Sequence, residues 1–202
     1  RQYATRGYFE KLMAQVFTGK ERFLPGNPSP TEKSSTKERQ SWLQISYMKE
    51  VYHSMSPKFT LGWMTEALYS SKNFSENYTA TMMQAGEFTP TPHSKLMYNE
   101  SFRANQYVAA GIKPILILND MFQFRTELYG FMPIFPIKRN ALNNAFYGKP
   151  LSRFEYMGEA SIICHLPFGA ISAYVNHYSS PKKEWNVGLT IGWQLFNYRF
   201  VE

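Results

Sequence analysis

The segment Glu184–Phe200 constrains the fold more than any other part of the chain, because its residues alternate strictly in character. Successive side chains of a β-strand point to opposite faces, so this segment is predicted to be one strand with an apolar face and a small or polar face. Its regular part covers about 11 residues, roughly 35 Å, which at a tilt near 45° spans about 25 Å. The apolar face comprises Trp185, Val187, Leu189, Ile191, Trp193 and Leu195. This height and the two tryptophans are typical of the lipid-facing band of an outer-membrane barrel, although a long strand of a soluble sandwich also alternates.

The composition excludes a helical membrane protein but not a barrel. Hydrophobic residues make up 44% of the 202 residues, yet no run approaches the roughly 18 apolar residues of a spanning helix. Aromatic residues are frequent, at 17%, and charged residues are few, at 18%. This balance favours β structure with interfacial aromatic belts over an ordinary soluble surface.

The net charge of +7 does not indicate nucleic acid as a partner. The Lys and Arg residues are scattered among presumed loops, and no basic helix or nucleic-acid motif gathers them. The single cysteine, Cys164, precludes an internal disulfide framework.

About nine consecutive strands are predicted from alternation and turn residues. They cover Tyr8–Phe17, Trp42–Val51, Lys58–Tyr69, Thr79–Thr89, Phe102–Leu118, Met121–Met132, Arg153–Leu166, Ala170–Tyr178 and the segment from Glu184. Gly111 and Pro114 predict a bulge or bend in the fifth strand. Short turns (Ser54–Pro57, Asn119–Asp120, Pro167–Gly169) alternate with long polar loops (Pro25–Lys37, Ser70–Asn77, Pro133–Pro150), as in the meander of an outer-membrane barrel.

The strand Met121–Met132 carries three long polar side chains on one face. Gln123, Arg125 and Glu127 alternate with the apolar Phe122, Phe124 and Leu128. Such a polar face is costly in a dry sandwich core but ordinary in a wet barrel lumen. The sequence therefore predicts two sets of barrel residues. The lipid-facing set adds Phe122, Phe124 and Leu128 to the apolar face of the last strand, and the lumen-facing set is Gln123, Arg125, Glu127, Asn186, Thr190 and Gln194.

Several runs resemble a known family. They are Gly158–Ser161, His165–Ser172 with Asn176–Tyr178, Gly192–Asn197, and Ala109–Pro114 with Phe124–Tyr129. Together they resemble the C-terminal surface-antigen barrel of Bacteroidetes patatin-like phospholipases, a branch of the outer-membrane assembly-factor superfamily. The resemblance implies an all-β antiparallel transmembrane barrel of about 16 strands, of which residues 1–202 would form the C-terminal half.

The same resemblance implies the surroundings of the chain. It places the protein in the outer membrane of a Gram-negative bacterium, with membrane lipid and the remaining barrel strands, of the same or another chain, as partners. The tripeptide Arg6-Gly7-Tyr8 is similar to the Arg-Gly-aromatic motif of the superfamily's inward-folded loop, and the start of a strand is the alternative.

No catalytic residues, cofactor or metal site are expected in this chain. The Gly-x-Ser-x-Gly elbow of a patatin domain is absent, and Asp120 is the only aspartate. His53, His93, His165 and His177 have no metal-ligand spacing, although His165 and His177 could share a face. Three functions remain open: the membrane anchor or translocation region of a patatin-like lipid acyl hydrolase, an outer-membrane protein-assembly or translocation barrel, and a soluble lipid-binding β-barrel.

Overall fold

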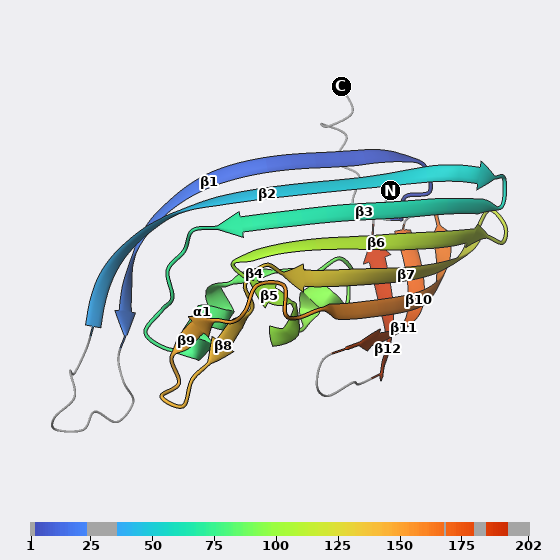
Figure 1. Cartoon of the computed structure of the whole chain (residues 1–202). Helices are drawn as coiled ribbons and strands as arrows, with labels where there is room; N and C mark the ends of the chain where they lie inside the picture. The colour runs from blue at the N-terminus through green and yellow to red at the C-terminus, as the bar shows by residue number, and fades with distance from the viewer. Residues whose placement is uncertain (1–2, 24–35, 168, 180–184, 194–202) are drawn as a thin grey trace.

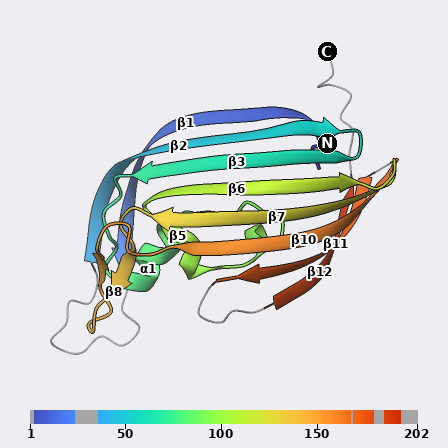
Figure 2. The same ribbon diagram turned by 45° about the vertical axis from the view of Figure 1, so that its right-hand side comes forward.

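The structure is a computed structural model that describes residues 3–23, 36–167, 169–179 and 185–193. Its main body is one eight-stranded antiparallel sheet, in which each strand pairs with the next sheet strand along the chain (Figures 1 and 2). The strands are β1 (Gly7–Phe23), β2 (Thr36–Ser56), β3 (Phe59–Ser70), β6 (Gln106–Ile117), β7 (Phe122–Pro133), β10 (Glu155–Leu166), β11 (Gly169–Tyr178) and β12 (Trp185–Trp193). The prediction of an all-β antiparallel meander is therefore confirmed. Among the described residues the sheet is open, with β1 and β12 at its two ends.

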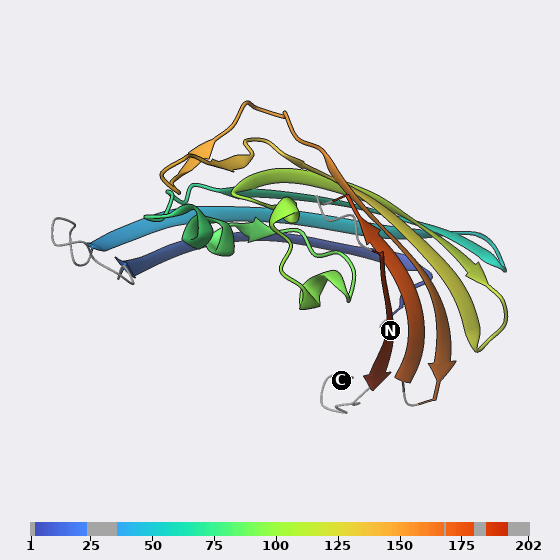
Figure 3. The ribbon, with the colours of Figure 1, turned by 90° about the horizontal axis from the view of Figure 1, so that it is seen from below.

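Two long connections form a cap: the one between β3 and β6 lies on the concave side of the sheet, and the one between β7 and β10 adjoins it at one end of the strands (Figure 3). We use "cap" for residues 71–105 and 134–154. The cap contains α1 (Tyr78–Gln84), the short 3₁₀ turns η1 (Ser94–Leu96) and η2 (Glu100–Phe102), and the two-stranded pairs β4 (Gly86–Glu87) with β5 (Arg103–Ala104) and β8 (Ile137–Arg139) with β9 (Ala145–Tyr147).

The cap fixes which face of the sheet is the inner one. Phe88 and Phe102 of the cap are fully buried against Tyr107, Tyr129 and Phe131 of the sheet. We call this concave, cap-covered face the inner face and the convex one the outer face. Because opposite residues of paired strands share a face, the register assigns every strand residue to one of them.

The strands are staggered steadily from one end of the sheet to the other. One row of paired residues crosses the outer face, from Trp185 of β12 to Tyr8 of β1, through His177, Gly158, Leu128, Ile112, Trp63 and Val51. β1 and β12 both begin at or next to this row and run from it in opposite directions. The strand midpoints therefore shift by about 11 residues, roughly 36 Å, over seven strand spacings of roughly 34 Å in total. With the midpoints in one plane, the strands are tilted by about 45°, near the range of about 35–45° in closed barrels.

Connections of different length lie at opposite ends of the sheet. Connections of two to four residues follow β2, β6 and β10, which end at one edge of the sheet, the short-turn end. Connections of six or more residues follow β1, β3, β7 and β11, which end at the opposite edge of the sheet, the long-connection end. The alternation of short and long connections is as predicted. No helix among the described residues is long and apolar enough to cross a membrane.

The predicted strand Thr79–Thr89 is wrong. The other eight predicted strands correspond to the eight strands of the main sheet. Residues 78–84 form α1 instead. Asn77 caps this helix, because its side chain accepts a hydrogen bond from the backbone N–H of Ala80 at 2.8 Å. Ala, Met and Gln are good helix formers, and the buried Met82 packs with Ala85 and Ile137 of the cap. Local capping and packing therefore override an alternation that was weak.

Two further predictions are wrong. β6 has no bulge, since its residues on either side of Pro114 keep one register with β7. Pro114 lacks an N–H donor, and the β6–β7 pairing is interrupted only at Lys113 and Pro114. The register shift lies between Ser54 and Ser56 of β2 instead. Residues 133–150 are also more than a loop, because they contain the β8–β9 hairpin.

Candidate functional site

The outer face is largely apolar and exposed from β1 to β12, and on β1 and β2 it also carries the ion pair of Glu10 and Lys49. On β12 the side chains of Val187 and Ile191 are 82% and 70% exposed, and Leu12 and Val16 of β1 are as open at the opposite end. Between them lie Ile112, Leu116, Leu128 and Ile162, which are also exposed. An apolar surface this continuous is unusual on a soluble monomer and marks contact with a partner or with lipid.

The residues predicted to face lipid lie on this outer face. Trp185, Val187, Leu189 and Ile191 are exposed on β12, as are Phe122 and Leu128 on β7, while Phe124 is half-buried. Trp193 ends β12, and Leu195 lies outside the described residues. The register fixes the face of those side chains that the structure describes, while their contact with lipid stays a prediction.

The residues predicted to face a lumen lie on the inner face, and three of them are buried. Gln123, Arg125 and Glu127 are 2%, 4% and 8% exposed. Asn186 pairs with the buried Asn176, and Thr190 pairs with the buried Ser172, which places both on the same face. Gln194 lies outside the described residues.

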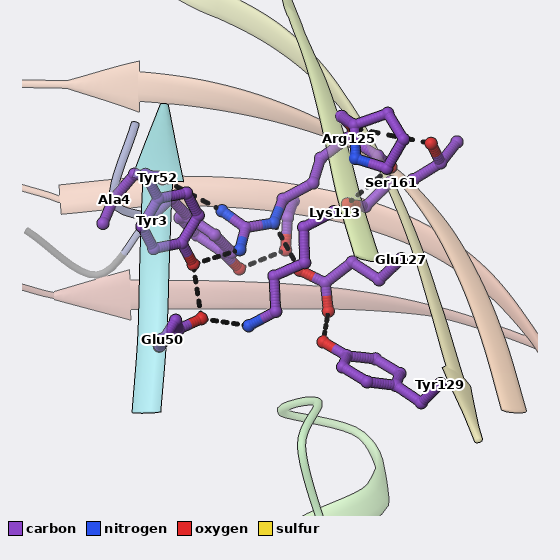
Figure 4. Close-up of polar contacts among 12 residues, drawn as sticks. Tyr3, Ala4, Glu50, Tyr52, Lys113, Arg125, Glu127, Tyr129 and Ser161 are labelled. Carbon is purple, nitrogen blue, oxygen red and sulfur yellow. Dashed lines mark hydrogen bonds and ion pairs between the residues drawn. The ribbon is translucent and has the colours of Figure 1, made fainter. Parts of the chain in front are cut away.

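Arg125 is the centre of a polar network on the inner face (Figure 4). Its Nε forms an ion pair with Glu127, and its Nη2 donates to the hydroxyl of Tyr52 at 2.8 Å. Tyr129 donates from its hydroxyl to the other oxygen of Glu127. Each of these charged groups is thus neutralised and hydrogen-bonded, which a buried ion pair requires.

A second ion pair joins this network through Tyr52. Lys113 of β6, 5% exposed, pairs with Glu50 of β2, and Tyr52 donates to Glu50 at 2.6 Å. The six side chains Glu50, Tyr52, Lys113, Arg125, Glu127 and Tyr129 form what we call the polar network. It joins β2, β6 and β7, and every charge within it has a partner of opposite sign. Its chemistry is that of a structural clamp, since no carboxylate or amine in it stands free for acid–base work.

The sequence reasoning found Arg125 and Glu127 but missed the other members of the polar network. Lys113 sits in an apolar run, Ile112–Leu118, where a lone lysine is the signal that could have found it. A cationic side chain in such a strand needs a buried partner. The partner, Glu50, is distant in sequence, so only the fold identifies it.

Residues preceding β1 cross the inner face and reach the far side of the sheet. The hydroxyls of Tyr3 and Ser172 are 2.9 Å apart, and Arg125 Nη1 donates to the backbone oxygen of Ala4 at 3.3 Å. Arg6, Gly7 and Tyr8 follow at once: Gly7 and Tyr8 pair with Tyr52 and Val51, and all three are exposed. In this structure Gly7 and Tyr8 are therefore the first residues of β1, and Arg6 directly precedes them.

Three titratable side chains of the cap have a shifted pKa and a defined contact. His93 Nδ1 is 2.8 Å from the hydroxyl of Tyr178, and burial lowers the pKa of His93. Lys72 lies 4.4 Å from the ring centroid of Trp42, and burial lowers its pKa also. Burial and the hydrogen bond to Glu100 raise the pKa of Tyr78. These contacts attach the cap to β2, to β11 and to itself.

His165 and His177 do not share a face. The ring of His165 lies against Tyr3 on the inner face, whereas His177 pairs with Gly158 on the outer face, between Tyr156 and Trp185. The register of β10 with β11 decides their faces, because His165 pairs with Ala170, and Ala170 and His177 are an odd number of residues apart on one strand. Within the described ranges no three His, Cys, Asp or Glu side chains lie close enough to hold a metal ion.

Comparison with known proteins adds no assignment: no protein-family model, curated protein or solved structure matches the chain.

Proposed function

We propose that this chain is a membrane-spanning region of an outer-membrane β-barrel. The observation that carries the proposal is the distribution of side chains, which is the reverse of that in a soluble protein. Val187 and Ile191 are exposed on the convex face, whereas Lys113 and Arg125 are buried on the concave one. Apolar side chains on the outside suit contact with lipid, and polar side chains on the inside suit a hydrated barrel interior.

Two further observations support a barrel over an open sheet. The steady stagger corresponds to a strand tilt of about 45°, which closure of a sheet requires. Short and long connections at opposite ends match the short periplasmic turns and long outer loops of outer-membrane barrels. A soluble lipid-binding barrel would need the opposite arrangement, with its polar side chains outside.

The open edges of β1 and β12 require partners in this proposal. An unpaired row of N–H and C=O groups is not tolerated in hydrocarbon, because each costs several kcal/mol. Further strands, from the same chain or from another, would therefore pair with both edges. The resemblance to patatin-like phospholipases supports a lipid acyl hydrolase as the full-length protein, with these strands as its anchor.

The first test is the location and heat-modifiable migration of the full-length protein. After cell fractionation, we expect recovery with outer membranes and a shift in mild-detergent electrophoresis between unboiled and boiled samples. Recovery in the soluble fraction without detergent, with no shift, would contradict the proposal. Release of fatty acid from phospholipid vesicles by the full-length protein then tests the acyl-hydrolase part separately.

A further inference from the structure

Three cations gather on the outer face where β1 and β2 extend past β3. In the register of this hairpin Lys20 lies directly opposite Arg39, and Arg22 lies two residues beyond Lys20 on the same face. All three side chains are exposed. We call Lys20, Arg22 and Arg39 the basic patch.

The neighbouring residues establish that these cations point outward. Glu21 and Gln40 alternate with them and turn to the opposite, cap-facing side, where Ser75 Oγ donates to Glu21 at 3.1 Å and Gln40 Nε2 donates to the same oxygen at 3.4 Å. Side chains alternate along a strand, so the basic patch faces away from the cap.

No described side chain neutralises the basic patch. The ion pairs among the described side chains involve other cations, and Glu21, which alternates with Lys20 and Arg22, is turned toward Ser75. Like charges directly opposite each other on paired strands are destabilising. An anion bound between Lys20 and Arg39 would remove that cost.

The height of the basic patch indicates which anion it meets. Val16 and Leu43, a directly opposed pair, are the last exposed apolar side chains of the outer face on this hairpin before Lys20. Lys20 follows Val16 by about 13 Å of strand, which at a tilt near 45° is about 9 Å of height. The headgroup layer of each leaflet is about 5–8 Å thick and begins where the apolar band ends. The backbone of Lys20 and Arg39 therefore lies near the outer boundary of this layer, and their long side chains can reach back into it.

We propose that the basic patch binds the phosphate-bearing headgroups of the bilayer leaflet at the long-connection end; this inference rests on the proposed function. Arg22 and Arg39 supply planar guanidinium groups, which can donate two parallel hydrogen bonds to one phosphate, and Lys20 adds a point charge. The patch thus fixes the depth of the β1–β2 hairpin in the membrane and enriches anionic lipid beside it.

The test measures binding of phosphatidylglycerol to the purified full-length protein in a zwitterionic detergent, by native mass spectrometry. The variant Lys20→Gln/Arg22→Gln/Arg39→Gln is compared with a control of equal charge change, Lys58→Gln/Lys138→Gln/Lys149→Gln, whose lysines are exposed but lie off the outer face of the hairpin. We expect the affinity to fall at least ~10-fold in the patch variant and by less than ~2-fold in the control, since each cation near an anionic surface is worth about a factor of five. Heat-modifiable migration verifies that both variants fold.

Three results would overturn the proposal. They are equal losses in the two variants, no loss in either, or displacement of the lipid by millimolar inorganic phosphate, which would make the patch a site for free anions. Flotation with vesicles of pure phosphatidylcholine separates this proposal from the proposed function. A wild-type protein that does not float overturns both proposals, whereas one that floats but shows no preference for phosphatidylglycerol overturns only the headgroup proposal.

Discussion

Arg125 Nη2 and the hydroxyl of Tyr52 lie 2.8 Å apart, although their strands, β7 and β2, are separated in the sheet by β3 and β6. In a flat sheet strands three positions apart are about 14 Å from each other. The two side chains meet because the sheet curves around its inner face. This hydrogen bond therefore joins distant strands and stabilises the curvature.

Replacing Tyr52 by Phe should destabilise the fold. The Tyr52 hydroxyl accepts from Arg125 and donates to Glu50, so two charge-assisted hydrogen bonds are lost. We expect a loss of about 1.5–3 kcal/mol in the free energy of unfolding, measured by urea denaturation in detergent micelles. The matched control is Tyr69→Phe on the exposed outer face, which should change stability by less than about 0.5 kcal/mol. Equal effects of the two substitutions would contradict the bridging role.

Replacing Arg125 alone by Met should destabilise the fold more than replacing Arg125 and Glu127 together. The single change leaves Glu127 buried without its cation, at about 3–5 kcal/mol. Adding Glu127→Gln removes the orphaned charge, so the double variant should be more stable than Arg125→Met alone. The same denaturation experiment measures both, and additive losses would show that the two side chains do not interact.

Charge on the two faces of β12 should have opposite consequences. In a membrane, Leu189→Lys places a cation against hydrocarbon, at about 2–4 kcal/mol near the midplane. Its neighbour Thr190 faces inward, so Thr190→Lys should fold nearly as well as the wild type. The measurement is the fraction that folds into phosphatidylcholine vesicles, read from heat-modifiable migration. If both variants fold equally well, the outer face does not contact lipid.

Gly111 should be replaceable by no other residue, whereas Gly158 should tolerate alanine. A Cβ on Gly111 would overlap the ring of Tyr129, which donates to Glu127. A Cβ on Gly158 would lie 3.5 Å from Leu128, an ordinary contact. We expect Gly111→Ala to lower stability by about 1–3 kcal/mol through this overlap, and Gly158→Ala to leave it nearly unchanged, in the same denaturation assay.

Acid should loosen the cap at His93. Because burial lowers the pKa of His93 in the folded state, the unfolded chain binds a proton more readily there. Stability is thus unaffected above the ordinary pKa of about 6.5 and falls as the pH drops through the window below it. The protection of the backbone N–H groups of η1 against hydrogen exchange, relative to the rate for an unstructured chain at the same pH, should fall between about pH 6.5 and 5 in the wild type. In His93→Asn this pH dependence should vanish; its persistence would assign the effect to another group.

Most of the sheet was predictable because the alternation of apolar and polar residues in each strand shows which side chains lie on which face. β7 and β12 alternate so regularly that their outer and inner residues follow from the period alone. The connections were predictable in length but not in content. The helix α1 depends on the Asn77 cap and on burial of Met82 against Ile137, which is distant in sequence.

The polar network could be predicted only in part, for a related reason. Arg125 and Glu127 are two residues apart on one strand, so alternation places them together. Lys113, Glu50 and Tyr52 join them only through the curvature of the sheet and the pairing of β2 with β3 and of β3 with β6. Contacts between strands that are not neighbours have no signature in the local sequence.

The aromatic cluster beneath the cap bears on transport. Phe88 and Phe102 close the long-connection half of the inner face with dry side chains, while the ion pairs of Arg125 and Lys113 occupy the half nearer the short turns. Ions moving along this wall would meet first a hydrophobic barrier and then fixed, mutually compensated charges. A barrel completed around these strands would accordingly conduct ions poorly while the cap is in place. Any current would require the cap to move away from the inner face.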